Sequence, residues 1–400
     1  MLASLGAASA QGLYDIAPND DALESLPITW SAGVDIGYND NVTPTVTKGF
    51  DGYEEGSGNV HAYVGAAWVS LTPQTTWDVY GRIGGTYYFD APSSMSNDGY
   101  GEGRLGVNWA HRVSERLRFT SRNYVAYQME PDYNYGIGSQ DPQLDPYFIY
   151  NTDNAVGYRW TDRFATYTGF TFSGVDYDTA ASGNDRQTWS LYNQFRYRAS
   201  EQTVWTLDYR YSATSADGAA ADSDSHYLLA GIEHRFSPNT VGVLKVGAQF
   251  RDSDTGEDST SPYFEAALRS RVNEQFSIRL FSRYSMEDYG TSFGGYSYDG
   301  NDTFRLGISG NYIVSSQLTI HGGFNYIMTD YQDATLAGIS DLDQDLWNAY
   351  IGFSYQINDG FYVTGSYNYT DSSSSGGSIP ASASRDYSQN RAALGLRFEF

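Results

Sequence analysis

Arginine is the residue type whose chemistry and spacing are most informative in this sequence of 400 residues. Many arginines, and one lysine, stand at polar positions within segments where apolar and polar residues alternate. A guanidinium group stays positively charged, and its planar fork of N–H donors fits carboxylate, sulfate and phosphate groups. Eighteen of the 24 basic residues belong to this set: Arg82, Arg104, Arg118, Arg122, Arg159, Arg196, Arg198, Arg210, Arg235, Lys245, Arg251, Arg269, Arg271, Arg279, Arg283, Arg305, Arg391 and Arg397.

Residue types that support catalysis or metal binding are sparse and dispersed. The sequence has no Cys, which excludes thiolate metal sites and cysteine nucleophiles. The closest two of its five His, His226 and His234, would lie about 26 Å apart on a strand that rises about 3.3 Å per residue, too far to share a metal ion. No H-E-x-x-H motif and no P-loop occurs in the sequence. The sequence therefore predicts no catalytic, metal-binding or cofactor-binding residues.

Composition excludes several classes of protein. The 48 Asp and Glu exceed the 24 Lys and Arg, so the formal net charge is −24, and nucleic acid is not expected as a partner because phosphate contacts require a basic face. No apolar run approaches the roughly 18 residues of a membrane-spanning helix. An aromatic content of 16% is too high for a disordered chain. The 42 Gly and 36 Tyr favour a β-rich chain with many turns.

The arginines need elements that place them on one face, and period-two alternation supplies these elements. Alternation puts successive side chains on opposite faces of a strand, so Leu306 and Ile308 face away from Arg305 and Ser309. The pattern predicts eighteen strands, near 28–38, 59–70, 77–89, 99–111, 117–127, 151–160, 164–176, 187–198, 204–213, 226–236, 241–251, 262–272, 276–286, 303–314, 318–329, 345–356, 361–370 and 388–400.

The connections between these strands predict the architecture. Eight short turns alternate strictly with nine longer polar loops, as in transmembrane β-barrels with short periplasmic turns and long extracellular loops. Because no strand edge can remain unpaired in lipid, the sheet must close. The predicted fold is an all-β, closed antiparallel transmembrane β-barrel of eighteen strands, with sixteen as the alternative. A barrel of this size is too wide for side chains to fill, which favours an aqueous channel.

Sorting charges by face divides the net charge into two parts. Lipid-facing Arg or Lys costs about 2–4 kcal/mol at the bilayer midplane, so the polar face must point inward. The predicted inner wall carries eighteen basic and eight acidic residues, or 18 − 8 = +10, and the remainder carries 6 basic and 40 acidic residues, or −34. Inward acids are Asp35, Asp78, Glu102, Asp153, Asp208, Glu233, Glu265 and Glu399.

Two interpretations of the basic wall remain open. Rings of Arg bias a pore toward anions. Alternatively, the arginines only hold the barrel together by pairing with acids on neighbouring strands. Under this second interpretation, the expected pairs are Arg196 with Asp208, Arg210 with Glu233, and Arg251 with Glu265.

The N-terminus reads as a targeting segment. Residues 2–10 are small and apolar and end in Ala8-Ser9-Ala10, similar to the cleavage region of a secretory signal. The predicted organisation is a signal-peptide remnant at 1–10, a periplasmic N-terminal segment at 11–27 and the barrel at 28–400.

The C-terminal segment resembles that of bacterial outer-membrane β-barrel proteins. Leu394, Leu396, Phe398 and Phe400 alternate up to the final residue. The segment from Ile28-Thr29-Trp30 to Asn41-Val42-Thr43-Pro44 is similar to the first hairpin of the putative β-barrel porin 2 group. The resemblance implies a Gram-negative-type outer membrane, with lipid and lipopolysaccharide around the barrel. It also implies that Phe398 and Phe400 serve as a signal to the outer-membrane assembly machinery.

Together these observations favour a porin-like channel for passive diffusion of small hydrophilic solutes, including anionic ones, through an Arg-lined pore. No cofactor is expected, and association between copies of the chain stays open. Loop 128–150 is the best candidate for a constriction because of its length, its Tyr and its three Pro. The alternatives are a conduit for polysaccharide export and a plugged structural or adhesive barrel. A hydrolase site assembled from distant residues at the rim is the remaining enzymatic alternative.

Overall fold

The computed structural model describes residues 25–42, 56–91, 95, 97–129, 146–178, 185–217, 222–254, 258–287, 292–293, 296–334, 341–376 and 386–400. The predicted signal-peptide remnant at 1–10 lies outside these residues, as does nearly all of the predicted periplasmic segment at 11–27. Most of the loop predicted to constrict the pore, residues 130–145, also lies outside them.

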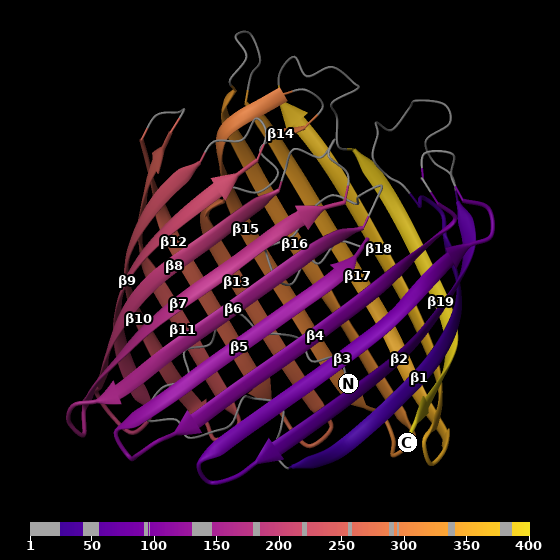
Figure 1. Ribbon diagram of the computed structural model, residues 1–400, viewed down its shortest axis with the longest axis horizontal. Coiled ribbons are helices and arrows are strands. Elements are labelled where there is room, and N and C mark those ends of the chain that lie inside the picture. The colour runs from indigo at the N-terminus through magenta and orange to yellow at the C-terminus, as the bar shows by residue number, and fades with distance from the viewer. Residues whose placement is uncertain are drawn as a thin grey trace.

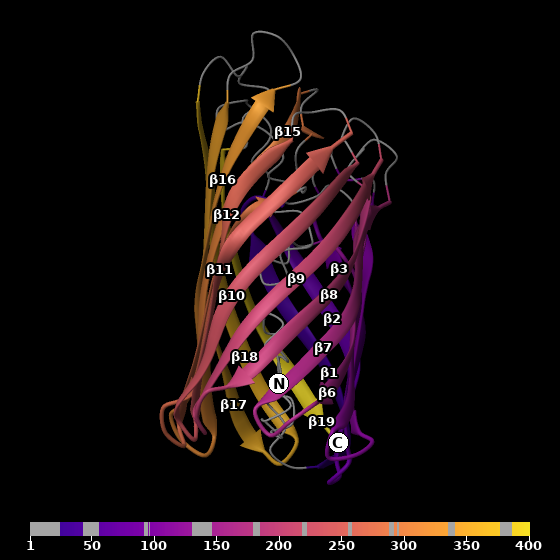
Figure 2. The ribbon, with the colours of Figure 1, turned by 90° about the vertical axis from the view of Figure 1, so that its left-hand side faces the viewer.

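The described residues form a closed antiparallel barrel with an oval cross-section (Figures 1 and 2). Apart from the two-residue β14, each strand pairs with its neighbours in sequence, and β1 pairs with β19 to close the wall. The strands are β1 (Leu26–Asn39), β2 (Ser57–Leu71), β3 (Thr75–Tyr88), β4 (Gly99–Arg112), β5 (Leu117–Gln128), β6 (Tyr147–Arg159), β7 (Phe164–Tyr177), β8 (Arg186–Arg198), β9 (Thr203–Ala216), β10 (Ser223–Ser237), β11 (Thr240–Ser253), β12 (Ser259–Arg271), β13 (Phe276–Glu287), β14 (Ser292–Phe293), β15 (Tyr296–Ile313), β16 (Leu318–Ala334), β17 (Leu342–Asn358), β18 (Phe361–Gly376) and β19 (Tyr387–Glu399).

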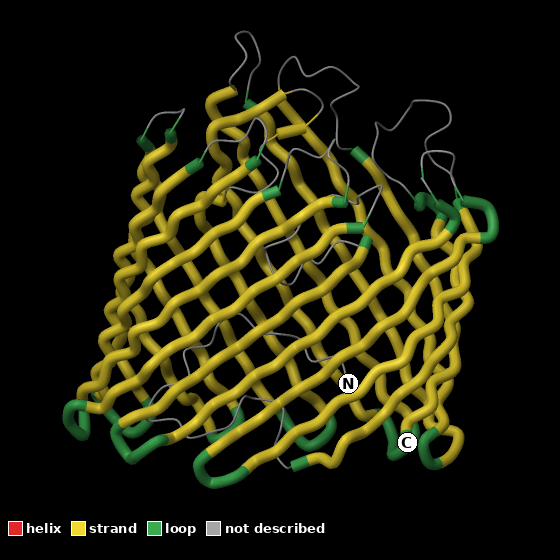
Figure 3. The backbone as a smooth tube through the Cα atoms, in the orientation of Figure 1, coloured by secondary structure: helices red, strands yellow, loops and turns green. Residues whose placement is uncertain are grey.

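The wall has eighteen strands, which confirms the predicted number. The two-residue β14 pairs only with the start of β15, whereas β13 pairs directly with β15 and thereby bypasses it. The eight short turns, of two to four residues, all lie at the end of the barrel that also holds the C-terminus (Figure 3). This is the predicted arrangement of short periplasmic turns.

The four longest strands exceed their predicted lengths by five or six residues. β15, β16, β17 and β18 have 16 to 18 residues each, whereas the alternation indicates segments of about 9–13. β18 continues through a run of Ser to Gly376, a segment that the pattern assigns to a loop. Ladder hydrogen bonds join backbone groups, so a strand can continue past the point where apolar residues stop marking the lipid-facing side.

Alternating exposure distinguishes the two faces of the wall. Ile36 is 65% exposed and Ile83 is 71% exposed. Contact of such large aliphatic side chains with water would be unfavourable. On the other face, Arg196 is fully buried and Arg305 is only 3% exposed. The apolar side chains therefore face lipid, and the charged side chains face the interior.

Backbone bonds close the barrel between β1 and β19. Nine residue pairs run from Ser31–Glu399 to Asn39–Arg391. Below them, the N–H groups of Trp30 and Phe400 each donate to the carbonyl of the other residue, at 2.8 and 2.9 Å. Above them, the Asp40 carboxylate accepts from the backbone N–H and the side-chain amide of Asn390, at 2.6 and 2.7 Å. The closing strands are thus joined from Trp30 to Asp40.

Candidate functional site: the inner wall of the barrel

All sixteen arginines predicted to line the pore fall on the inner face. Following the register from strand to strand around the barrel brings each of them to the same side of the wall. Two further buried charged residues of this face lie at strand ends that the sequence pattern assigns to loops. Arg186 begins β8 and Glu287 ends β13, and both are buried. Extending the alternating pattern by a few residues at these two strand ends would have predicted both.

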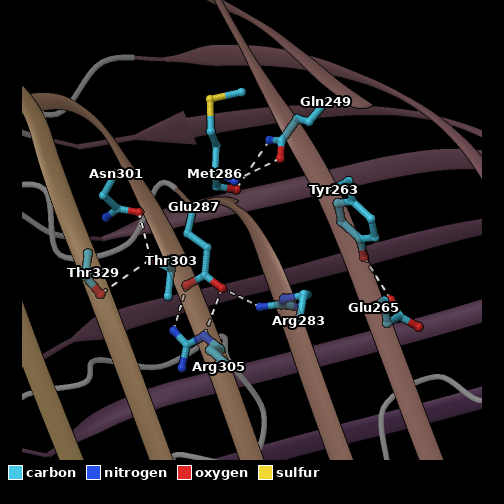
Figure 4. Close-up of polar contacts among 10 residues, drawn as sticks. All are labelled: Gln249, Tyr263, Glu265, Arg283, Met286, Glu287, Asn301, Thr303, Arg305 and Thr329. Atoms are coloured by element: carbon cyan, nitrogen blue, oxygen red, sulfur yellow. Dashed lines mark hydrogen bonds and ion pairs between the residues drawn. The ribbon is translucent and has the colours of Figure 1, made fainter. Parts of the chain in front are cut away.

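Glu287 joins two arginines on adjacent strands (Figure 4). Arg283 of β13 and Arg305 of β15 stand directly opposite each other, where two like charges repel. The Glu287 carboxylate accepts from Arg305 Nε at 2.8 Å and Nη2 at 2.6 Å, and it also accepts from Arg283 Nη2. A bidentate pair of this kind is geometrically specific and strong. Two guanidinium groups share one carboxylate, so the cluster retains one net positive charge.

The ion pairs on β8–β11 differ from those expected. Arg196 donates to Glu233 at 2.6 Å and to Gln194 at 2.7 Å, and Lys245 contacts Asp208 at 2.9 Å. The predicted pairing of Arg196 with Asp208 is wrong. The register places Thr206 opposite Arg196, whereas Asp208 lies two residues further along β9 and contacts Lys245.

The other two predicted pairs are also wrong. Arg210 stands opposite Tyr227, six residues from Glu233. Glu265 stands opposite Lys245, and Arg251 stands opposite Ser259. A difference of six residues along a strand is about 20 Å, far beyond the reach of these side chains.

A third charged cluster lies beside the closing strands. His61 contacts Asp35 through Nδ1 at 3.2 Å and Glu102 through Nε2 at 3.0 Å. Arg82 lies 3.5 Å from Glu102, and its guanidinium covers the ring of Tyr63 at 3.7 Å from the centroid. These side chains come from β1, β2, β3 and β4, so contacts between charged groups connect the first four strands of the barrel.

Charge is distributed unevenly around the inner wall. Sixteen of the eighteen basic residues assigned to this face lie on β3–β15, the exceptions being Arg391 and Arg397 of β19. β16, β17 and β18 contain no Lys or Arg, and apart from His321 their described inward side chains are uncharged polar, Tyr or aliphatic groups. In the ring order, these three strands lie across the lumen from β6–β8. The lumen therefore has a basic arc, β3–β15, and a neutral arc, β16–β18.

Hydrogen-bonded amides and hydroxyls line the neutral arc. The Asn348 amide donates to Asn368 at 3.0 Å and to Thr370 at 2.9 Å, and Asn348 accepts from Asn325 at 3.4 Å. Higher on the same strands, Gln344 donates to Ser372 at 3.1 Å. This arc offers dipoles rather than net charge to a solute.

The inner face also holds apolar side chains, which the sequence pattern did not predict. Tyr147 and Ile149 of β6 pack with Tyr124 of β5 and Val175 of β7 in one buried cluster. A smaller buried cluster joins β16, β17 and β19. Both faces of β6 carry aromatic residues here, since Phe148 lies on the outer face, so alternation of apolar with polar residues does not mark them.

The remaining predictions concern the outer face and bound ions. Phe398 and Phe400 point outward at the periplasmic end and are 47% and 74% exposed. Among the described residues, no helix is long and apolar enough to span a membrane. Within the same part of the chain, no group of three or more His, Asp or Glu side chains could hold a metal ion.

Comparisons with known proteins place these features in context. A family model described as "Putative beta-barrel porin 2" matches residues 178–400. No curated protein matches the chain.

Several solved structures are similar to the chain. OccAB4 of Acinetobacter baumannii shares 11% identity, with 94% of this chain and 99% of that chain covered and a TM-score of 0.47. OccK2 (OpdF) of Pseudomonas aeruginosa in complex with glucuronate shares 13% identity over 93% and 98% of the two chains, with a TM-score of 0.45. OpdK of the same organism with vanillate shares 12% identity over 93% and 99%, with a TM-score of 0.46.

Proposed function

The chain belongs to the putative beta-barrel porin 2 family and is an outer-membrane β-barrel protein, and from this premise we propose that its lumen is a passive, anion-preferring diffusion pore. The solutes are small and hydrophilic. The sixteen inward arginines line the path, and they set its preference for solutes that carry a carboxylate, sulfate or phosphate group.

The basic arc is the observation that supports this proposal. Seven inward acids on β3–β15, including Glu287, accompany the sixteen assigned basic residues of that arc. An excess of one sign along a channel wall raises the local concentration of ions of the opposite sign. Internal pairing, as between Arg305 and Glu287, reduces this excess but does not remove it.

We infer that the barrel is a channel without a catalytic role. The family is one of porins, which conduct solutes. The most elaborate histidine site, at His61, contacts two carboxylates and a guanidinium, an arrangement that suits an electrostatic cluster rather than nucleophile activation. We also infer that the outer face contacts lipid and lipopolysaccharide and that Phe398 and Phe400 are read during assembly.

Conductance in planar bilayers tests the proposal. The purified protein is expected to form ohmic channels whose reversal potential in a KCl gradient indicates preference for chloride over potassium. Replacing Arg104, Arg122 and Arg279 together by Gln removes three charges from the basic arc and should lower that preference several-fold. Replacing the turn residues Arg116 and Arg163 by Gln is the control, since both lie in the short turns.

Two outcomes would contradict the proposal. Preference for potassium in the unmodified protein would show that the inner arginines do not set selectivity. Absence of any conductance from folded protein would favour the plugged structural barrel. A polysaccharide conduit would instead show a large conductance that a long sugar polymer blocks.

A further inference from the structure

Tyr167 of β7 carries a buried hydroxyl group on the inner wall. The residue is 6% exposed, and its ring lies across β6 over Gly157, the residue directly opposite it. A Cβ atom on Gly157 would come within 2.6 Å of the ring, so only glycine permits this position. The hydroxyl has no hydrogen-bond partner among the described residues. A buried hydroxyl without a hydrogen-bond partner is energetically unfavourable, so it requires an explanation such as a bound water or ion.

Two arginines of the inner wall stand on strands close to this ring. Because the ring extends over Gly157, it carries the hydroxyl toward β5, where Arg118 stands opposite Gly157. On the other side, Gln194 of β8 stands opposite Tyr167 and accepts a hydrogen bond from Arg196 at 2.7 Å. Four consecutive strands, β5 to β8, thus carry one phenol and two arginines in the same part of the inner wall.

The nearby carboxylates already have partners. Glu233 accepts from Arg196 at 2.6 Å. Asp153, four residues before Gly157 on β6, accepts from Tyr192 at 2.8 Å and stands opposite Arg122. Arginine side chains only donate hydrogen bonds, so they cannot accept the phenolic proton. The group that complements a phenol donor in a basic part of the wall is an oxygen acceptor with negative charge.

We propose that Tyr167, Arg118 and Arg196 form an oxyanion-binding subsite for the carboxylate or phosphate group of a solute, near the periplasmic end of the lumen. The inference rests on the proposed pore function and specifies where in the pore an anion is held. The Tyr167 hydroxyl donates one short hydrogen bond, and the two guanidinium groups supply charge. The neutral arc faces this subsite across the lumen, so the basic side of the path alone fixes the anionic end of the solute.

Anion binding to the folded protein in detergent tests the subsite independently of conductance. Inorganic phosphate and acetate are titrated separately by isothermal calorimetry. Tyr167→Phe removes the hydroxyl and keeps the ring over Gly157, and it should weaken binding about tenfold because hydrogen bonds to charged groups are stronger than neutral ones. Arg118→Gln should weaken binding at least as much. The heat-modifiable migration of the barrel on gels shows that each variant is folded.

Tyr350→Phe is the matched control, because Tyr350 lies over Gly323 in the same way but on the neutral arc. It should leave anion affinity unchanged. Equal affinities of Tyr167→Phe and the unmodified protein for both anions would overturn the subsite and indicate a bound water only. Absence of anion binding to a protein that conducts would also overturn the subsite while leaving the pore function in place. A subsite confirmed in a protein that does not conduct would overturn the pore function instead.

Discussion

At the scale of single residues, the pairing of tyrosine with glycine explains part of the unusual composition. Five inward tyrosines each lie flat over the glycine directly opposite on the next strand, where a Cβ would approach the ring to between 2.2 and 2.6 Å. A ring held flat against the wall covers backbone and leaves the lumen open, a known use of aromatics beside strand glycines. The pairs are Tyr63–Gly33, Tyr80–Gly106, Tyr167–Gly157, Tyr192–Gly169 and Tyr350–Gly323.

Replacing Gly157 by Ala tests this explanation. The added methyl group would displace the Tyr167 ring, and such overpacking typically costs about 1–3 kcal/mol. The free energy of unfolding, measured by urea titration of protein folded in lipid vesicles, should fall accordingly. Gly101→Ala is the control, because the nearest atom to a Cβ there lies 4.0 Å away. Equal unfolding midpoints for the two variants would contradict the packing role of Gly157.

Sequence alone could assign residues to faces but not to partners. Parity along a strand decides which way Arg196 points, and alternation is visible without a structure. The choice of Glu233 rather than Asp208 as its partner depends on the stagger between β8, β9 and β10. A shift of two residues changes every ion pair on a ladder while preserving the face, so pairing could not be predicted from the pattern.

At the scale of strands, the pairing between β12 and β13 is interrupted. Their ladder ends at Phe264–Tyr284, although β11–β12 and β13–β15 pairing continues further. Continuing the register would place Pro262 opposite Met286, and proline has no N–H to donate. The Gln249 side chain of β11 takes the place of these bonds, accepting from the Met286 N–H at 3.0 Å and donating to its carbonyl at 3.3 Å (Figure 4).

Gln249→Leu should therefore loosen the upper end of β13. With its side-chain acceptor removed, the Met286 amide should exchange with deuterium at least tenfold faster, as resolved by mass spectrometry with fragmentation. Gln344→Leu serves as the control, because this equally buried glutamine bonds the hydroxyls of Ser372 and Tyr331. Unchanged exchange at Met286 in Gln249→Leu would show that another group protects this amide.

The last strand offers a separate test of the proposed assembly signal. Phe400→Ala keeps the backbone bonds to Trp30, so the closed barrel should remain equally stable once it has folded. The amount of protein in the outer membrane of cells should fall several-fold, whereas refolding into detergent in vitro should not change. Ile357→Ala, which also removes an exposed apolar side chain at the periplasmic end, is the control. Equal amounts of both variants in the membrane would argue against recognition of Phe400.

Strand number and order could be predicted because each hairpin repeats one local signal, alternation followed by a short turn. The upper ends of the strands could not be predicted in this way. Residues 371–376 read as a Ser-rich loop, yet their backbone continues the ladder with the first residues of β17, Leu342 to Trp347. Above the lipid, no solvent contrast distinguishes the two faces, and the alternation signal therefore disappears while the hydrogen bonds persist.

At the scale of the whole molecule, the net charge of −24 describes neither surface that a solute meets. The inner wall is basic along β3–β15 and neutral along β16–β18, so positive potential is concentrated on one side of the oval lumen. A solute with an anionic end and a polar, uncharged end would find a complementary surface on each side. The field of the wall and the Tyr167 subsite would then contribute to selectivity over different distances.

Ionic strength separates these two contributions. Screening shortens the reach of the wall charges from about 30 Å at 0.01 M salt to about 3 Å at 1 M. If the basic arc attracts anions through its long-range field, the chloride-to-potassium permeability ratio should be highest near 0.01 M KCl and approach one near 1 M. Reversal potentials measured at a fixed concentration ratio over this range provide the test. Since direct contact at Tyr167 acts over hydrogen-bond distance, Tyr167→Phe should leave this salt dependence intact. A permeability ratio that does not vary with salt would mean that selectivity arises at short range, within a narrow part of the lumen, and not from the arc as a whole.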